Sequence, residues 1–320
     1  MAVTSRARAP GTLPVPLTSF VGRQRDLQEL EALIGEPEGR LVTLVGPGGV
    51  GKTRLALELA PRLVSTSPEI AFVELDLLVN PDLLLPTVAN ALGVREQPRE
   101  ALIDTVVTAI TDRQGVLLLL DTCEHVVGAC ALIVERLLRS CPELRVLATS
   151  RERLDVPGEA VYPVSGLALA AEEATGQDIL KSEASHLFVE RAHQLKPDFV
   201  LDEPGALALA RICRRLDGIP LAIELAATAA RAMSLDDIAL RLDDRFHLLQ
   251  AAGRTTSRRH HTLRAAIDWS HQLLEAEEAT LFRHLAVFSG GFTLDAVEAV
   301  EGREALIPLL RLIDKSLVVL

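Results

Sequence analysis

The chain has 320 residues, of which 48% are hydrophobic and 24% charged, which is enough to bury the cores of two or three domains and excludes a disordered protein. The 33 basic and 44 acidic residues give a net charge of −11, which disfavours direct binding to a nucleic-acid backbone. No apolar run approaches the roughly 18 residues of a membrane span, and no signal-peptide core occurs near the start, so we expect a cytoplasmic protein.

The first half of the chain predicts an α/β domain. Residues 1–16 are expected to be a flexible lead-in, and residues 17–164 alternate short apolar runs with helical patterns, which is typical of a three-layer domain on a parallel sheet. Right-handed crossovers would place the strand ends, and any ligand, along one edge of that sheet. The expected strands are residues 41–45, 71–75, 116–120, 144–149 and 160–163, and the expected helices are residues 53–63, 81–92, 100–111 and 124–140.

The second half predicts helices. Residues 165–249 are expected to form an all-α helical domain, and residues 250–320 resemble a winged-helix domain. Because the sequence stops inside an apolar run, which would leave an open sheet edge, we expect that domain to be truncated at its C-terminal end. The expected helices are residues 184–194, 205–216, 221–231, 235–242, 263–274, 276–285, 294–300 and 306–315, followed by a strand at 316–320.

The cysteines do not suggest a metal site. They are Cys123, Cys130, Cys141 and Cys213, without a C-x-x-C pair, and their spacing suits neither zinc nor a disulfide framework. We expect isolated buried thiols in a reducing compartment.

A phosphate-binding motif follows the first predicted strand. Residues 46–53, G-P-G-G-V-G-K-T, match G-x-x-x-x-G-K-T between a strand and a helix, where glycines let backbone N–H groups cradle phosphate oxygens. Lys52 would reach the β- and γ-phosphates, and the Thr53 hydroxyl would coordinate Mg²⁺. The flanking elements disfavour a glycine-rich turn with a chance lysine. The expected nucleotide-binding residues are Gly46, Pro47, Gly48, Gly49, Val50, Gly51, Lys52, Thr53 and Arg54.

Two carboxylates follow the third predicted strand. Asp121 ends the apolar run L-L-L-L-D and can hold Mg²⁺ through water, although an aspartate at a strand end is often a helix cap. Thr122 stands where active hydrolases often carry a second carboxylate. Glu124 is the nearest acidic alternative, but it could equally be a first-turn residue favoured by the helix dipole. We therefore expect slow turnover of ATP at most.

Arg151 ends the fourth predicted strand in the sequence T-S-R. An arginine there points at the ligand edge and can report on a γ-phosphate through charge-assisted hydrogen bonds. From spacing alone, a surface arginine paired with Glu152 or Glu159 is a serious alternative.

Several segments occur in one order that resembles a known family. F-V-G-R at 20–23, the P-loop, L-L-D-T-C-E-H at 119–125, T-S-R-E at 149–152 and G-I-P-L-A at 218–222 together resemble the NB-ARC family of STAND ATPases. This family comprises switch modules of plant resistance proteins, apoptosome scaffolds and large bacterial transcriptional regulators. T-L-R-A-A-I-D-W-S at 262–270, V-F-S-G-G-F at 287–292 and D-K-S-L at 314–317 are similar to the bacterial regulator branch.

The resemblance implies roles for further residues. Val21 and Arg23 would meet the adenine, Pro220 would close over the base or ribose, and Arg151 would sense the γ-phosphate. The motif that carries the family's winged-helix histidine is not visible. A basic cluster fits contact with DNA, contact with the nucleotide or a solvated linker, and we favour a linker or interdomain contact. The cluster comprises Arg254, Arg258, Arg259, His260, His261 and Arg264.

The resemblance also implies a switch that regulates transcription. ADP would hold the units closed, and exchange for ATP, with Mg²⁺, would favour an open state that associates with other copies of the protein. Further partners would be sensor and effector domains of the same protein, with little direct nucleic-acid binding and no membrane. One alternative is a conventional ATP-hydrolysing enzyme or transferase with its own substrate, but the sequence after residue 165 shows no set of acid/base groups for such a reaction. The other alternative is a scaffold with structural ADP.

Overall fold

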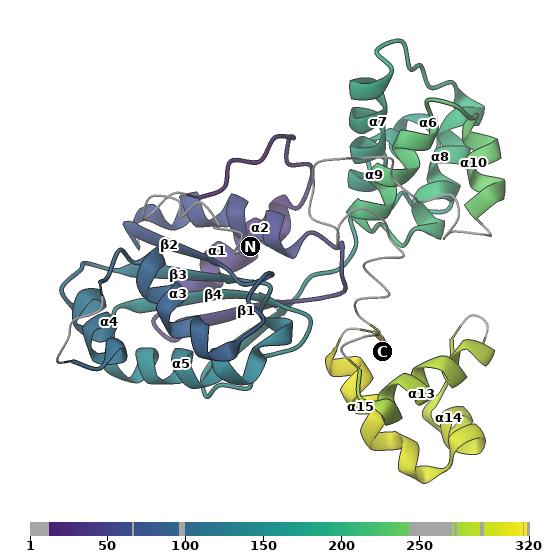
Figure 1. Cartoon of the computed structure of the whole chain (residues 1–320). Helices are drawn as coiled ribbons and strands as arrows, with labels where there is room; N and C mark the ends of the chain where they lie inside the picture. Colours follow the sequence, from purple (N-terminus) through teal and green to yellow (C-terminus); the bar gives the residue numbers. More distant parts are fainter. Residues whose placement is uncertain are drawn as a thin grey trace, which may run out of the picture. The chain divides into compact units, whose positions relative to one another are not determined.

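A computed structural model describes residues 13–65, 67–95, 100–242, 271, 274–288, 291–315 and 317–318. Contacts divide the chain into two compact units (Figure 1). The first, called the sheet unit here, consists of Met1–Phe20, Gln24–Val45 and Lys52–Pro163. The second, called the helical unit, consists of Val21–Arg23, Gly46–Gly51 and Val164–Leu320.

The sheet unit is built on a five-stranded sheet with the order β2-β3-β4-β1-β5. Every pairing in it is parallel, which confirms the predicted parallel-sheet α/β fold. The six residues of β3 are all buried, as expected of an apolar strand covered on both faces. The strands are β1 Leu41–Val45, β2 Glu69–Glu74, β3 Val116–Asp121, β4 Leu144–Ser150 and β5 Glu159–Pro163.

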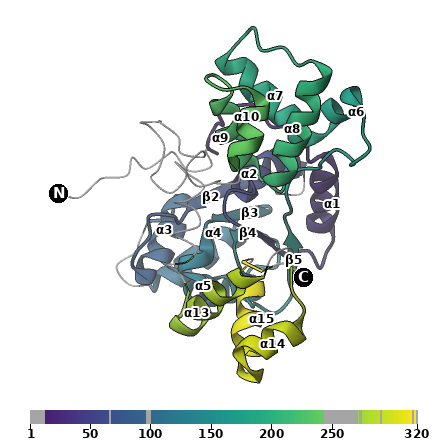
Figure 2. The same cartoon turned by 90° about the vertical axis from the view of Figure 1, so that its right-hand side faces the viewer.

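Helices cover both faces of this sheet. Alternate residues of β3, such as Leu118 and Leu120, pack in one core with α3, α4 and α5, so the intervening Leu117 and Leu119 face the other side. Figures 1 and 2 show α1 and α2 on that other side. The helices are α1 Gln24–Gly35, α2 Lys52–Leu59, α3 Leu84–Ala91, α4 Leu102–Thr111 and α5 Val127–Ser140, and the 3₁₀ turns are η1 Ala60–Ser65, η2 Pro81–Leu83 and η3 Cys123–His125.

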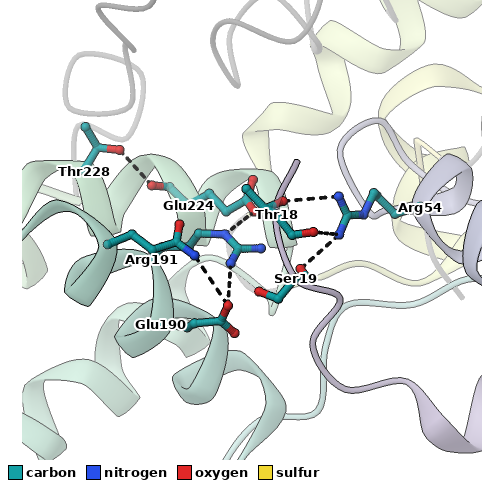
Figure 3. Close-up of polar contacts among 8 residues, drawn as sticks. Thr18, Ser19, Arg54, Glu190, Arg191, Glu224 and Thr228 are labelled. Atoms are coloured by element: carbon teal, nitrogen blue, oxygen red, sulfur yellow. Dashed lines mark hydrogen bonds and ion pairs between the residues drawn. The ribbon is translucent and has the colours of Figure 1, made fainter. Parts of the chain in front are cut away.

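The helical unit contains a helix bundle, and several of its helices begin with a capping side chain. The side chains of Ser182, Asp202 and Ser234 each accept a hydrogen bond from a backbone N–H three residues later, which satisfies a donor at the helix start. Arg191 pairs with Glu224 across two of the helices at 2.9 Å (Figure 3). The helices are α6 Gly176–Lys181, α7 Glu183–Leu195, α8 Glu203–Arg215, α9 Pro220–Ala229 and α10 Leu235–Arg241.

The last described helices have a core of their own. Leu281, Val297, Leu309 and Leu312 are buried together in it. The elements are α13 Ala276–His284, η6 Leu285–Val287, α14 Leu294–Glu301, η7 Arg303–Ala305 and α15 Leu306–Asp314. The winged-helix assignment stays a prediction.

Some predicted features lie outside the described residues. These are most of the lead-in, the basic cluster at 254–264, nearly all of the helix expected at 263–274 and most of the strand expected at 316–320. None of the helices in the described ranges combines the length and the apolar composition that a membrane span needs.

Gly218 supplies a turn that another residue cannot make. Its φ is +67°, and an added Cβ would lie 2.4 Å from the Leu167 carbonyl oxygen. We expect Gly218→Ala to lower the free energy of unfolding by about 2–4 kcal/mol, measured by urea denaturation. Gly128→Ala in α5, where an added Cβ meets nothing within 4 Å, should leave stability unchanged or higher. Equal urea midpoints for the two variants would contradict this account.

Candidate functional site

The glycine-rich segment of residues 46–51 joins the end of β1 to the first residue of α2, Lys52. Two of its glycines have positive φ, +81° at Gly49 and +98° at Gly51, which glycine adopts without the steric cost that a Cβ brings. Space is also limiting at Gly49, because an added Cβ would lie 2.9 Å from the Cβ of Leu221. The predicted P-loop therefore has the strand–turn–helix context that its motif requires.

Two backbone carbonyl groups of the loop are held by donors of the same helical unit. The Leu221 N–H, in the first turn of α9, donates to the Gly49 carbonyl at 3.2 Å, which satisfies an amide that lacks an intrahelical partner. The buried Arg23 guanidinium donates through Nη2 to the carbonyl oxygens of Val50 at 2.8 Å and Ser165 at 2.6 Å. These bonds fix the course of the loop from within the protein.

A hydrogen-bond network connects the start of α2 with the ends of β3 and β4. The Thr53 hydroxyl donates to Oδ1 of Asp121 at 2.7 Å, and the Thr149 hydroxyl donates to the same oxygen at 2.6 Å. The Thr122 backbone N–H donates in turn to Oγ1 of Thr149 at 2.9 Å. Burial raises the pKa of Asp121, whereas the bonds from Thr149 and Thr53 lower it. The network thus favours the ionised carboxylate against the cost of burial.

Lys52 is a buried cation at the start of α2. Burial lowers its pKa to about 8, against the opposing effect of Glu124 and, less strongly, of Asp121. Arg151 also lies near enough to lower the pKa of Lys52. An anion beside Lys52 would favour its charged form, so the ammonium is suited to meeting a phosphate.

The oxygen donors near Lys52 suit Mg²⁺ bound together with a phosphate. Thr53 offers a hydroxyl and Asp121 a carboxylate, and Mg²⁺ commonly takes one or two protein oxygens and completes its shell with water and substrate phosphates. Among the described residues, no group of three or more histidine, cysteine, aspartate or glutamate side chains could hold a metal ion alone. The donor set therefore fits a nucleotide–Mg²⁺ complex better than an all-protein metal cage.

Glu124 and Arg151 form a buried ion pair. The Nε of Arg151 lies 3.2 Å from Oε1 of Glu124, and their side chains are 7% and 6% exposed. Oε2 of Glu124 is buried and has no hydrogen-bond partner in the described part of the chain. The alternative partner Glu159 instead accepts hydrogen bonds from the backbone N–H groups of Leu154 and Asp155. The sequence did not predict the pairing of Glu124 with Arg151.

Arg54, the last residue expected around the P-loop, reaches toward the segment before α1. Its Nη2 donates to the carbonyl oxygens of Thr18 at 2.7 Å and Ser19 at 2.9 Å (Figure 3). The guanidinium thereby ties α2 to residues 18 and 19, and its predicted contact with a nucleotide stays a prediction.

The residues expected around the base lie in the helical unit. Val21 is buried in the core of the bundle, and Pro220 opens α9, 3.8 Å from where a Cβ of Gly51 would stand. The Arg23 side chain holds the loop as described above. The contacts predicted for these residues with adenine and ribose stay predictions.

Two groups of this site were not predicted from the sequence. The Thr149 hydroxyl had a signal, since a polar residue at the end of an apolar strand lies beside the carboxylate of the neighbouring strand. No sequence signal marked the Leu221 amide, because every residue but proline carries one.

Residues 36–156 match the family model described as an AAA domain. An uncharacterized protein of Mycobacterium tuberculosis is 41% identical over 314 residues, which are 95% of this chain and 76% of that protein. A second protein of that organism, with the provisional name of an HTH-type transcriptional regulator, is 44% identical over 288 residues, 88% of this chain and 31% of that protein. Among solved structures, the chain is similar to a signal transduction ATPase with numerous domains (STAND) from Pyrococcus horikoshii, which carries a tetratricopeptide repeat sensor. The TM-score is 0.44 and the sequence identity 16%, and the match covers 93% of this chain and 39% of that chain.

Removal of the Arg23 guanidinium, which holds two backbone carbonyl groups, should lower the free energy of unfolding. Arg23→Met leaves the carbonyls of Val50 and Ser165 without their charged donor, so we expect a loss of about 2–4 kcal/mol in the free energy of unfolding, measured in urea. Arg25→Met is the matched control, because that side chain is 90% exposed and pairs with Glu29 on the surface of α1, so we expect little change in the free energy of unfolding. A loss of stability as small for Arg23→Met as for Arg25→Met would show that the hydrogen bonds from Arg23 do not stabilise the protein.

Proposed function

This chain belongs to the same family as the uncharacterized mycobacterial protein that it matches over 95% of its length, and we propose that it is a nucleotide-operated switch that regulates transcription. It would cycle between an ADP-bound closed state and an ATP-bound open state. Residues 36–156 form a P-loop domain of AAA type, and the proposal concerns what that domain binds and what its binding controls.

The observation that carries the proposal is the network around Asp121. Thr53, the second residue of α2, donates to the Asp121 carboxylate at the end of β3, and Lys52 beside it is a buried cation of lowered pKa. Lys52 would bind the β- and γ-phosphates, while Thr53 and Asp121 would hold Mg²⁺ directly and through water. When bound, Mg²⁺ neutralises charge on the phosphates. ATP rather than GTP is proposed from the family resemblance.

Arg151 would distinguish ATP from ADP. It stands at the end of β4, and its guanidinium is held by Glu124, so a γ-phosphate would have to compete with that carboxylate. Glu124 is engaged with an arginine, and its other oxygen has no hydrogen-bond partner among the residues that the structure describes. A carboxylate whose oxygen is bound to an arginine is less available to orient an attacking water, which supports slow turnover of ATP at most.

The switch would act by favouring a different arrangement in each nucleotide state. Moving such an equilibrium from 1:99 to 99:1 requires about 5.5 kcal/mol of differential binding, for which contacts to the γ-phosphate are the available source. The open state would associate with other copies of the protein. A role in transcription is supported by the name of the relative of which this chain spans 31%, and the remainder of such a protein would supply sensor and effector domains.

Small-angle scattering tests the switch on the whole chain. We expect different profiles with ADP and with a non-hydrolysable ATP analogue, and a concentration-dependent increase in mass only with the analogue. Lys52→Ala, which removes the phosphate-binding cation, should give one profile with either nucleotide. Identical profiles for the unmodified chain, with both nucleotides shown to be bound, would contradict the switch and favour structural ADP.

The Glu124–Arg151 pair predicts how nucleotide preference can be changed. Glu124→Gln removes the charge that competes for Arg151, so the ratio of affinities for the ATP analogue and ADP should rise about threefold to tenfold in competition binding. Glu135→Gln, the same change on α5 where the side chain pairs with Arg139 at the surface, should leave the ratio unchanged. Fast ATP turnover that Glu124→Gln abolishes would instead make Glu124 a catalytic base.

A further inference from the structure

We propose that Thr149 is a positioning residue that directs one oxygen of Asp121 toward Mg²⁺. This role is distinct from the sensing role proposed for Arg151 two residues later. It rests on the proposed nucleotide site, because positioning matters only if Mg²⁺ and a nucleotide bind there.

The contacts of Asp121 are unequal at its two oxygens. Oδ1 accepts the hydroxyl groups of Thr53 at 2.7 Å and Thr149 at 2.6 Å. Oδ2 has a longer contact, 3.4 Å, from the hydroxyl of Thr122. Two short bonds therefore fix the carboxylate through Oδ1, and Oδ2 is the oxygen with more capacity for a metal-bound water.

The direction of the Thr149 proton follows from its other partner. The Thr122 backbone N–H can only donate, and it donates to Oγ1 of Thr149 at 2.9 Å. The single hydroxyl proton of Thr149 must then go to Asp121, because an ionised carboxylate only accepts. The hydroxyl is thus oriented by the backbone and transmits that orientation to the carboxylate.

The same reasoning orients Thr53. When its proton is donated to Oδ1 of Asp121, the lone pairs of its oxygen point away from that carboxylate and are available to a cation. By holding Oδ1 in place, Thr149 also holds the acceptor that directs Thr53. Both groups expected to serve Mg²⁺ therefore depend on the Thr149 hydroxyl.

The backbone is strained where it supports this hydroxyl. Thr122 has φ of +66°, and a left-handed conformation is costly for a β-branched residue. That conformation occurs in the residue whose N–H reaches Thr149. Backbone strain of this kind often marks a functional site. Here it agrees with a requirement for the Thr122 N–H to reach Thr149.

A buried threonine in this sheet does not by itself imply such a network. Thr43 in β1 is as buried as Thr149, and it pairs in register with Ala148, the residue before Thr149. Yet its hydroxyl oxygen has no hydrogen-bond partner among the described residues. Thr43 therefore provides a control with the same side chain in the neighbouring strand.

The test is the affinity for ADP, measured by calorimetry on the whole chain in Mg²⁺ and in EDTA. We expect Thr149→Val to reduce the gain in affinity that Mg²⁺ provides by about tenfold, while the affinity in EDTA stays within about twofold. Thr149→Ser, which keeps the hydroxyl, should restore the gain. Thr43→Val should leave both affinities unchanged.

Either of two results would overturn the inference. A full Mg²⁺ gain in Thr149→Val would show that the hydroxyl does not position Asp121, and equal weakening with and without Mg²⁺ would show a merely structural role. If Thr149→Val does not fold, by circular dichroism, Thr149→Ala provides the same test with a smaller side chain. An unmodified chain that binds no ADP in either condition would contradict the proposed function itself, which distinguishes the two failures.

Discussion

A parallel sheet brings the carboxyl ends of its strands to one edge, and the candidate site depends on that constraint. β1 is followed by the P-loop and then by Lys52 and Thr53, β3 ends at Asp121, and β4 ends just before Arg151. Because β4 lies between β1 and β3 in the sheet, its last residues stand next to groups from both neighbours. Thr149 reaches Asp121 from this central place.

Charge burial is the second constraint on the site. Four charged side chains lie close enough to one another at this site to interact electrostatically. They are the cations Lys52 and Arg151 and the anions Asp121 and Glu124. Burial lowers the pKa of both cations and raises that of Asp121, so each charge depends on its partners. A phosphate entering this group would add negative charge beside Lys52 and Arg151. Such a balance can differ between a diphosphate and a triphosphate, which a nucleotide switch requires.

Much of the fold could be predicted because the sheet is covered on both faces. The apolar run at 116–120 and the P-loop glycines indicate a buried strand and a phosphate-binding turn without reference to the rest of the chain. β2 begins at Glu69, two residues before the expected strand, since its first two residues are only half-buried and Glu69 is charged. The helix at Gln24–Gly35 was not predicted, although Leu27, Leu30 and Ile34 lie on one buried face.

The remaining features depend on pairings that sequence spacing does not give. Glu124 lies in a 3₁₀ turn before α5, so its carboxylate meets Arg151 from a neighbouring strand end. The Arg23 guanidinium donates to two carbonyl groups, a contact that spacing does not indicate because a long side chain can bind far from its own backbone, and its expected contact with the adenine stays a prediction. Such contacts can be identified only when the register of the strands and the path of the loops are known.

The most direct test of nucleotide binding uses protein purified gently, without added nucleotide. The protein is denatured, and any released small molecule is identified and quantified by chromatography. We expect stoichiometric ADP, retained through purification by the P-loop and Lys52. An empty site together with rapid steady-state turnover of ATP would contradict a switch that holds its product and would indicate a conventional enzyme.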